Sequence, residues 1–264
     1  MTSSSRFHQL HLQPEPLRLP NAWDAGSARQ IQNLGAQAIA TTSAGVAWSL
    51  GYRDGNHLPV AEYVARARSM ARVINVPLSV DIEGGYDDRA LAVADTVLRL
   101  IDAGVEGINI EDGSADPRLL CRKIEAIRAA STGAGVPLYI NVRTDVYARN
   151  LVPPPQKVSE VKARAQDYRQ AGADGLFVLG LVEAQEMQAI AKGSDLLLNV
   201  SVWPQLPPLA SLTACGVRRI SAGSWLPQTL WARNKQLVRG FLSQDETAPL
   251  MATATPYADI NALF

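Results

Sequence analysis

The sequence predicts an α/β fold, a (β/α)8 TIM barrel, because two kinds of helix-to-strand junction recur through its 264 residues. In the first kind, a helical segment ends in a small residue and glycine, and a short apolar strand follows directly. Glycine suits this place because it adopts the left-handed conformation that ends a helix. These glycines are Gly35, Gly104, Gly172 and Gly216. In the second kind, the strand begins at a proline, as at Val76-Pro77 and Val136-Pro137.

Together the two junctions predict eight short strands rich in Val, Ile and Leu, which is the number in a closed parallel barrel. We expect strands near residues 17–20, 38–42, 77–82, 106–111, 137–142, 175–179, 195–200 and 218–221. Helical periodicity predicts covering helices at 60–73, 90–103, 119–130 and 157–170. A doubly wound sheet is the alternative fold. No linker interrupts the pattern, so we predict one domain over 1–264, with 227–264 as a C-terminal helical segment for oligomerisation.

Composition excludes several classes of partner. The formal net charge is zero and the pI is about 6.8, so we expect neither nucleic acid nor an anionic membrane as a partner. Cys121 and Cys215 lie far apart without a metal-ligand spacing, which indicates a reducing compartment and no structural zinc. No apolar run approaches the length of a membrane span, and the N-terminus lacks a signal pattern. We therefore expect a cytoplasmic protein.

Carboxylates follow two neighbouring predicted strands. Asp81 and Glu83 end one strand and Glu111 ends the next, with a helical segment between them. The carboxyl ends of parallel strands lie on one face, so these acids are expected side by side. Crowded carboxylates repel one another unless a hard cation lies among them, and oxygen ligands favour Mg²⁺ or Mn²⁺ over zinc. The alternative is that they are helix caps and solvated turn acids.

Other strand ends contribute polar groups to the same face. Thr42-Ser43-Ala44-Gly45 forms a small-residue turn whose backbone amides could bind an anion, although it could be only a tight loop. Arg143 follows the fifth strand as a candidate cation, or as a partner of Asp145 or of an acid on a neighbouring strand in a rim ion pair. Asn199 follows the seventh strand and could bind substrate or cap the next segment. Asp54 lies in a glycine-flanked loop and could be merely solvated.

Taken together, the ordered motifs resemble the isocitrate lyase/phosphoenolpyruvate mutase superfamily along nearly the whole chain. The motifs are Asn21 to Ala28, Thr42-Ser43, Gly51-Tyr-Arg-Asp54, Asp81-Ile-Glu-Gly-Gly-Tyr86, Gly107-Ile-Asn-Ile-Glu-Asp112 and Asn141-Val-Arg-Thr-Asp145. The resemblance implies a (β/α)8 barrel, usually tetrameric, with a C-terminal helix swapped between subunits. It also implies an Mg²⁺ site that binds 2-oxo acids or their enol forms.

The resemblance assigns roles to individual residues. Asp81 would be the direct or nearest metal ligand, and Glu83 and Glu111 would hold the metal largely through water. Arg143 would neutralise the charge that develops in the reaction, and Asp54 would stand on a mobile gating loop. The substrate carboxylate and the enolate oxygen would be bound at the turn formed by Thr42, Ser43 and Ala44.

Departures from the pattern narrow the expected function. The lyases that cleave isocitrate or methylisocitrate carry a Lys-Lys/Arg-Cys-Gly-His loop after the fourth strand, and this chain has none. Cys121 lies nearby but in a helical run, so we interpret it as a helix residue. Where those lyases place Glu and Arg to hold additional carboxylates, this chain has Gly180 and Leu226 among apolar residues. The loop that binds the phosphoryl group in the mutases is also absent.

These observations predict an Mg²⁺-dependent carbon–carbon lyase or decarboxylase that acts on a small 2-oxo or dicarboxylic acid similar to oxaloacetate, through a stabilised enolate. An enzyme that rearranges or hydrolyses a C–P bond, of the phosphoenolpyruvate mutase or phosphonopyruvate hydrolase type, is the alternative within the family. A barrel that binds 2-oxo acids without catalysis is the alternative outside it. We expect a homo-oligomer, a dimer or a tetramer.

Overall fold

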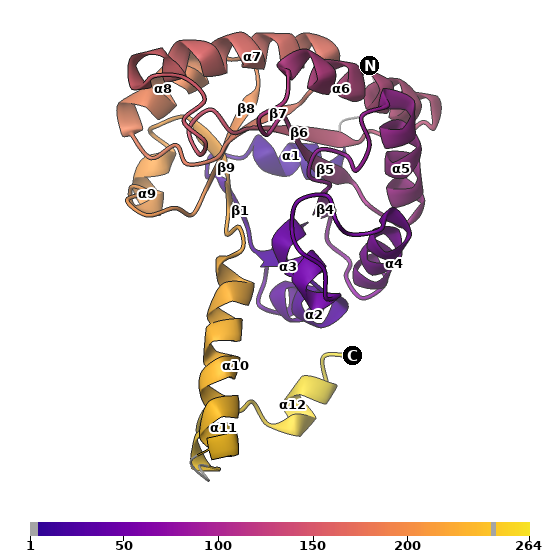
Figure 1. Cartoon of the computed structure of the whole chain (residues 1–264), viewed down its shortest axis with the longest axis vertical. Helices are drawn as coiled ribbons and strands as arrows, with labels where there is room; N and C mark the ends of the chain where they lie inside the picture. The colour runs from indigo at the N-terminus through magenta and orange to yellow at the C-terminus, as the bar shows by residue number, and fades with distance from the viewer. Residues whose placement is uncertain (1–4, 244–246) are drawn as a thin grey trace.

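The computed structural model describes residues 5–243 and 247–264 and contains one parallel sheet surrounded by helices (Figure 1). The strand order is β1-β9-β8-β7-β6-β5-β4-β3-β2. The five middle strands are β4 (Leu78–Asp81), β5 (Gly107–Glu111), β6 (Tyr139–Thr144), β7 (Gly175–Val178) and β8 (Leu197–Ser201). Nearly every residue on them is buried, as expected for a parallel sheet with helices outside and side chains within.

The two ends of this strand order belong to one interrupted strand. β1 (Leu17–Leu19) pairs with β9 (Val217–Ser221), whereas β2 (Asn21–Ala22) pairs with β3 (Ile39–Thr41). Between β1 and β2 lies only Pro20, which has no N–H to donate to a ladder. The sheet therefore closes into a barrel. The predicted (β/α)8 fold is confirmed, and the alternative of an open doubly wound sheet is wrong.

The helices follow the strands in the predicted alternation. The predicted helices are confirmed as α4 (Val60–Ala71), α5 (Ala90–Asp102), α6 (Pro117–Gly133) and α7 (Lys157–Ala171). The other helices of the barrel region are α1 (Arg6–His11), α2 (Ala25–Asn33), α3 (Ser43–Ser49), the 3-10 helix η1 (Pro154–Gln156), α8 (Ala184–Lys192) and α9 (Leu209–Leu212). The predicted junction glycines Gly35, Gly104, Gly172 and Gly216 all have positive φ, from +79° to +111°.

Helix α1 closes the amino-terminal end of the barrel. Its Phe7 is fully buried and lies against Gly107, the first residue of β5, where a side chain would collide with the Phe7 ring. His11 stacks on Tyr139 with ring centroids 4.1 Å apart. Burial and the nearby Arg219 lower the pKa of His11 to about 3, so this histidine is neutral in the folded protein. The interior of the barrel is therefore filled at this end by aromatic side chains.

The C-terminal helix α10 (Trp225–Ser243) extends away from the barrel (Figure 1). Only Pro227 and Gly240 are buried on it. Two short helices follow, α11 (Ala248–Ala252) and α12 (Tyr257–Asn261), and residues 244–246 of the predicted oligomerisation segment lie outside the described residues. The swapping of this segment between subunits stays a prediction. Over residues 5–243 and 247–264, no helix combines the length and apolar character needed to cross a membrane.

Candidate active site

A pocket of about 230 Å³ opens at the carboxyl ends of the strands. It gathers most of the predicted site residues, which come from separate strands and loops. The predicted lining residues are Thr42, Ser43, Ala44, Asp54, Asp81 and Arg143. The additional lining residues are Asn21, Asn109, Phe177, Leu179, Ser201, Val202, Trp203, Ser221, Gly223, Ser224 and Trp225.

Asp81 is the last residue of β4 and faces this pocket while remaining only 8% exposed. Its Oδ1 accepts a hydrogen bond from the backbone N–H of Glu83 at 3.0 Å, and its own N–H donates to Thr41 Oγ1 at 2.9 Å. Burial raises the pKa of Asp81 despite the opposing charge of Arg143. The carboxylate is thus fixed in place but incompletely compensated.

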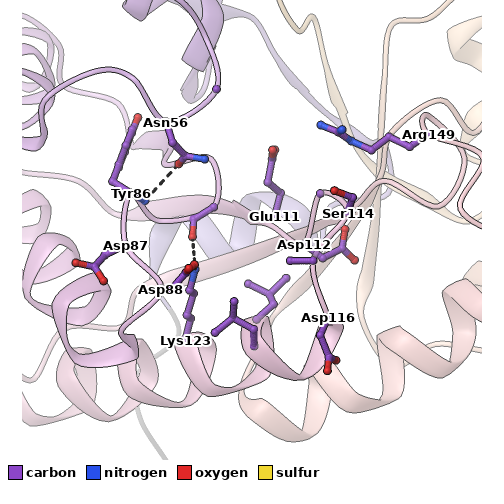
Figure 2. Close-up of a pocket in the computed structure, with 16 residues that line it drawn as sticks. Asn56, Tyr86, Asp87, Asp88, Glu111, Asp112, Ser114, Asp116, Lys123 and Arg149 are labelled. Atoms are coloured by element: carbon purple, nitrogen blue, oxygen red, sulfur yellow. Dashed lines mark hydrogen bonds and ion pairs between the residues drawn. The ribbon is translucent and has the colours of Figure 1, made fainter.

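Glu83 follows in a backbone conformation that non-glycine residues seldom adopt, with φ of +53°. Its Oε2 accepts a hydrogen bond from the N–H of Asn56 in the Asp54 loop, and its Oε1 accepts one from Tyr86 Oη at 3.2 Å. Figure 2 shows Asn56 and Tyr86 joined by a further hydrogen bond. Burial raises the pKa of Glu83 to about 7, and the nearby Asp54 and Asp81 also act to raise it. The loop that carries Asp54 is therefore anchored to the end of β4.

Glu111 ends β5 and pairs with Arg143, with Oε2 and Nη1 2.7 Å apart. Burial raises the pKa of Glu111 to about 8, because the attraction of Arg143 does not offset desolvation and repulsion from Asp81 and Asp145. Glu111 also lines a neighbouring pocket of about 450 Å³ in which most of the charged side chains are acidic (Figure 2). The carboxylates at this rim therefore carry more negative charge than the neighbouring cation compensates.

Arg143 is the one basic side chain among the residues that line the substrate-sized pocket. Besides its bond to Glu111, it donates from Nε and Nη2 to the two oxygens of Asp145, at 2.7 and 3.0 Å. The rim ion pair that the sequence offered as an alternative is present. The same guanidinium nevertheless faces the pocket, so it can neutralise charge there only as part of this network.

The acids at the rim suit a hard cation that is held partly through water. Among the described residues, no group of three or more His, Cys, Asp or Glu side chains lies close enough to ligate one ion directly. Asp81, Glu83 and Glu111 therefore do not form a direct three-carboxylate cage. All three are largely buried and have raised pKa values, so a divalent cation would relieve the electrostatic cost that they share. The donor set fits Mg²⁺ or Mn²⁺ in this manner.

The segment Thr42 to Gly45 differs from its predicted form. It begins helix α3, with Thr42 as the N-cap, and is not a free turn. The first N–H groups of a helix have no partner within the helix, so they can still face an anion in the pocket. A Cβ at Gly45 would lie 2.8 Å from the Thr42 side chain and 3.0 Å from that of Trp23, which explains the glycine.

Asn199 does not line the pocket, contrary to the prediction that it contacts substrate. It is fully buried inside the barrel, where its Oδ1 accepts from Asn141 Nδ2 at 2.9 Å and its Nδ2 donates to Val200 O at 2.7 Å. The sequence placed it correctly on an inward face but not at the correct depth. Its contacts instead support the layer of side chains beneath the pocket.

Comparison with known proteins agrees with this geometry. The family model of phosphoenolpyruvate phosphomutase matches residues 7–242. The chain belongs to the phosphoenolpyruvate phosphomutase family. This confirms the resemblance drawn from the motifs, since that family is part of the isocitrate lyase/phosphoenolpyruvate mutase superfamily.

Individual members of the family resemble this chain over most of its length. An uncharacterized protein of Mycobacterium tuberculosis is 36% identical over 260 residues, which cover 97% of this chain and 95% of that protein. An oxaloacetate decarboxylase of Bradyrhizobium sp. is 30% identical over 209 residues, which cover 75% and 70% respectively. A crystal structure from Burkholderia cenocepacia, provisionally described as a phosphonomutase, has a TM-score of 0.84 and 38% identity, and the alignment covers 88% of this chain and 97% of that one.

Within this member of the phosphomutase family, a layer of buried side chains at the base of the pocket was not predicted as part of the site. Asn109 Oδ1 accepts hydrogen bonds from Asn141 Nδ2 at 2.9 Å and from Arg219 Nη2 at 3.1 Å. These two donors orient the amide, and a hydrogen bond from Asn109 acts to lower the pKa of Asp81. Burial lowers the pKa of Arg219 to about 10. The signal in the sequence is an asparagine between two apolar residues on each of three strands.

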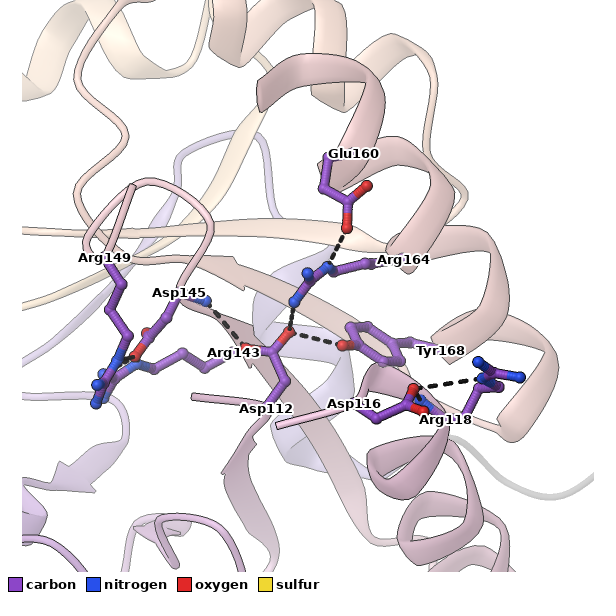
Figure 3. A network of polar contacts seen from close by, with 9 residues as sticks. All are labelled: Asp112, Asp116, Arg118, Arg143, Asp145, Arg149, Glu160, Arg164 and Tyr168. Carbon is purple, nitrogen blue, oxygen red and sulfur yellow. Dashed lines mark hydrogen bonds and ion pairs between the residues drawn. The ribbon is translucent and has the colours of Figure 1, made fainter. Parts of the chain in front are cut away.

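Asp112 and Cys121 lie outside the pocket of this phosphomutase-family barrel. Asp112 Oδ2 accepts from Arg164 Nη1 at 2.8 Å and from Tyr168 Oη at 2.7 Å, and its Oδ1 accepts from the N–H of Asp145 at 3.1 Å (Figure 3). This fully paired acid joins β5 to β6 and α7. Cys121 is partly buried on α6 and does not line the pocket, in agreement with its interpretation as a helix residue.

Proposed function

We propose that this protein is an Mg²⁺- or Mn²⁺-dependent carbon–carbon lyase or decarboxylase that acts on a small 2-oxo or dicarboxylic acid similar to oxaloacetate. The observation that carries the proposal is the convergence of Asp81, Arg143 and the start of α3 on one pocket of about 230 Å³. This arrangement supports the binding of a metal ion, a 2-oxo carboxylate and an oxygen that gains negative charge. Membership in a family of lyases and mutases supports catalysis over a purely binding role.

In this proposal Asp81 would hold the metal directly, and Glu83 and Glu111 would hold it largely through water. A bound divalent cation would act as a Lewis acid toward the keto oxygen of the substrate. Burial disfavours the charged form of the acids, so a cation would stabilise that form. Hydrogen bonds with Glu83 N–H and Thr41 Oγ1 hold Asp81 in place. Holding the ligands in place avoids reorganisation when the ion binds.

The side of the pocket that stabilises charge is formed by helix α3 and β6. The N–H groups of Ser43 and Ala44 in the first turn of α3 would bind the carboxylate or the enolate oxygen. Arg143 would balance the charge that develops on that oxygen. Asp54 would lie over the bound acid, because its loop is tied to Glu83 and Tyr86 through Asn56. Closure of this loop would exclude water from the enolate.

The test uses oxaloacetate. Its C3–C4 bond breaks, C4 leaves as CO2, and the electron pair of that bond stays on the remaining fragment as the enolate of pyruvate. A proton then adds at C3 to give pyruvate. We expect pyruvate to form faster than in solution with Mg²⁺ or Mn²⁺ present, and the gain to disappear with EDTA. If the rate with protein and metal equals the rate with metal alone, the hypothesis of a decarboxylase is rejected for this substrate.

A C–P bond enzyme is the second candidate, and the family and the Burkholderia cenocepacia relative support it. A phosphonate group carries more negative charge than a carboxylate, so it needs additional cationic donors. Arg143 is the one basic side chain that lines the pocket, and it already pairs with Glu111 and Asp145. We therefore rank this candidate second. Phosphate release from phosphonopyruvate tests it.

We further propose that α10 packs against a second copy of the chain, as the family resemblance implies. Exposed apolar side chains support this contact because such a row costs free energy in water. They include Leu230, Trp231, Val238 and Phe241 on α10. Light scattering should give a dimer or a tetramer, and Trp231→Glu should reduce that mass. A monomeric wild-type protein would contradict the proposal.

A further inference from the structure

One side of the pocket is apolar. Phe177 and Leu179 come from the end of β7, Val202 and Trp203 follow β8, and Trp225 begins α10 after β9. They contribute to the same pocket of about 230 Å³ as Asp81 and Arg143, which come from β4 and β6. A ligand held by its 2-oxo carboxylate at the charged side therefore extends its remaining atoms toward these side chains.

Three polar side chains on this side already donate hydrogen bonds within the protein, whereas the hydroxyls of Ser221 and Ser224 only accept them. Trp225 Nε1 donates to Val202 O at 2.8 Å, which also fixes the indole against the loop after β8. Ser201 Oγ donates to Ser221 O at 3.2 Å. Asn21 Nδ2 donates to a backbone carbonyl at 2.7 Å, and its Oδ1 accepts a backbone N–H at 2.9 Å. These donors are not available to a second anionic group of the ligand.

The basic groups of the pocket also disfavour a second anionic group on the ligand. Among the lining residues only Arg143 is basic, and Glu111 and Asp145 each lie 2.7 Å from its guanidinium nitrogens. A carboxylate that faces Leu179 and Trp203 would lose its hydration without gaining a counter-charge, which is unfavourable. A methyl or larger alkyl group in that place would instead exchange water for apolar contacts.

We propose that this side is a subsite for an alkyl substituent on C3 of the ligand. The preferred ligands are then 2-oxo acids that carry alkyl groups at C3. Apart from a carboxylate that leaves in the reaction, they carry no second carboxylate. The proposal rests on the proposed function, because it assumes that the 2-oxo carboxylate lies near Asp81 and Arg143. It adds a specificity that the family resemblance does not supply.

The experiment measures equilibrium binding of non-reacting ligands to the full chain with saturating Mg²⁺, by calorimetry or by the fluorescence of Trp203 and Trp225. Oxalate reports the charged side alone. Pyruvate, 2-oxobutanoate and 3-methyl-2-oxobutanoate then add methyl groups at C3, and 2-oxoglutarate adds a distal carboxylate. We expect 3-methyl-2-oxobutanoate to bind about tenfold or more tightly than pyruvate, from the contribution of its two added methyl groups. We expect 2-oxoglutarate to bind more weakly than pyruvate.

Variants at Leu179 assign the effect to this side of the pocket. Leu179→Ala should reduce the preference for the branched acid, and Leu179→Lys should reverse the order in favour of 2-oxoglutarate, while oxalate affinity changes little. Leu91→Lys, at a site on α5 that is 80% exposed, is the matched control and should leave every affinity unchanged. Circular dichroism checks that each variant is folded.

The possible outcomes separate this inference from the proposed function. If oxalate binds with Mg²⁺ but the affinities are flat along the methyl series, or 2-oxoglutarate binds best, the alkyl subsite is wrong and the proposed function stands. If oxalate does not bind in the presence of Mg²⁺ or Mn²⁺, both proposals fail. An increasing series that is insensitive to Leu179→Ala and Leu179→Lys would also overturn the subsite.

Discussion

Glu111 and Asp112 are neighbours in sequence, but their carboxylates differ in how completely they are hydrogen-bonded and paired. Asp112 is fully buried as a side chain and is bonded by Arg164, Tyr168 and a backbone N–H (Figure 3). Glu111 has a single guanidinium partner, which it shares with Asp145, and burial raises its pKa to about 8. Glu111 is the last residue of β5, and Asp112 follows the strand and directs its carboxylate to Arg164 and Tyr168 on α7.

This difference distinguishes acids that stabilise the fold from acids that await a ligand. A buried carboxylate with a full set of donors stabilises the structure that brings those donors together. A buried carboxylate with an incomplete set of donors is destabilised in its charged form, and a bound cation would stabilise that form. By this criterion Asp81, Glu83 and Glu111 form one group, and Asp112 and Asp145 form the other.

The largest effect is expected for Asp81→Ala. Loss of the nearest metal ligand should lower kcat/KM by about a thousandfold or more, which corresponds to about 4 kcal/mol of transition-state stabilisation. The fold should survive, because this acid lacks full compensation in the folded protein. Steady-state kinetics and thermal unfolding measure the two effects. A variant that loses its fold while Mg²⁺ gives the wild type no protection would make Asp81 structural.

The opposite pattern is expected for Asp112→Asn. Arg164 would lose its fully buried partner and keep only Glu160, whose side chain is 33% exposed, and breaking a buried pair in this way costs about 3–5 kcal/mol of folding free energy. Urea unfolding measures the loss. Asp116→Asn is the matched control, since Asp116 pairs with Arg118 at the surface and its side chain is 57% exposed. Equal stability for the two variants would contradict the distinction between the two groups of acids.

Ligand binding should stabilise the protein through the uncompensated acids. With Mg²⁺ and oxalate at a hundred times the dissociation constant, stability should rise by about 2.7 kcal/mol. The increase should vanish in Asp81→Ala and persist in Asp116→Asn. Thermal unfolding with each ligand alone and with both together measures it. Stabilisation by oxalate without a metal ion would place the anion elsewhere.

The pH dependence of the metal-free protein should have one sign for Glu83 and Glu111 and the opposite sign for Asp145. The raised pKa values of Glu83 and Glu111, about 7 and 8, add stability at low pH that is lost as the pH rises through those values. The pKa of Asp145 is lowered, because hydrogen bonds from Arg143 and Arg149 outweigh the effect of burial, so its contribution is lost as the pH falls. His11, with a pKa lowered to about 3, likewise favours the folded state more as the pH rises toward 6.5.

The window from about pH 7.5 to 9 separates the two glutamates from His11, because there this histidine is neutral in the folded protein and mostly neutral in the unfolded chain. Each of the two glutamates changes stability by at most about 1.4 kcal/mol per pH unit. Glu111→Gln should flatten this part of the curve in EDTA. A wild-type curve that is already flat in this window would mean that Glu111 is adequately compensated.

Much of this arrangement could be predicted because local chemistry determines it. The junction glycines required a left-handed backbone, and the acids after β4 and β5 marked the carboxyl ends of their strands. The depth of Asn199 could not be predicted, because a strand period of two gives the face of a residue but not its layer within the barrel. The buried position of Arg219 was not predicted, because it depends on partners from other strands, such as Asn109.

The smallest effect is expected for Arg149→Ala. Arg149 lies 2.7 Å from Asp145, but its side chain is 52% exposed and the same carboxylate already receives two hydrogen bonds from Arg143. An exposed partner of this kind contributes less than about 1 kcal/mol. Urea unfolding of Arg149→Ala, compared with Asp112→Asn, measures the contribution. A loss as large as that of Asp112→Asn would mean that Arg143 is too fully engaged by Glu111 to satisfy Asp145, and Arg143 would then be less free to face a substrate.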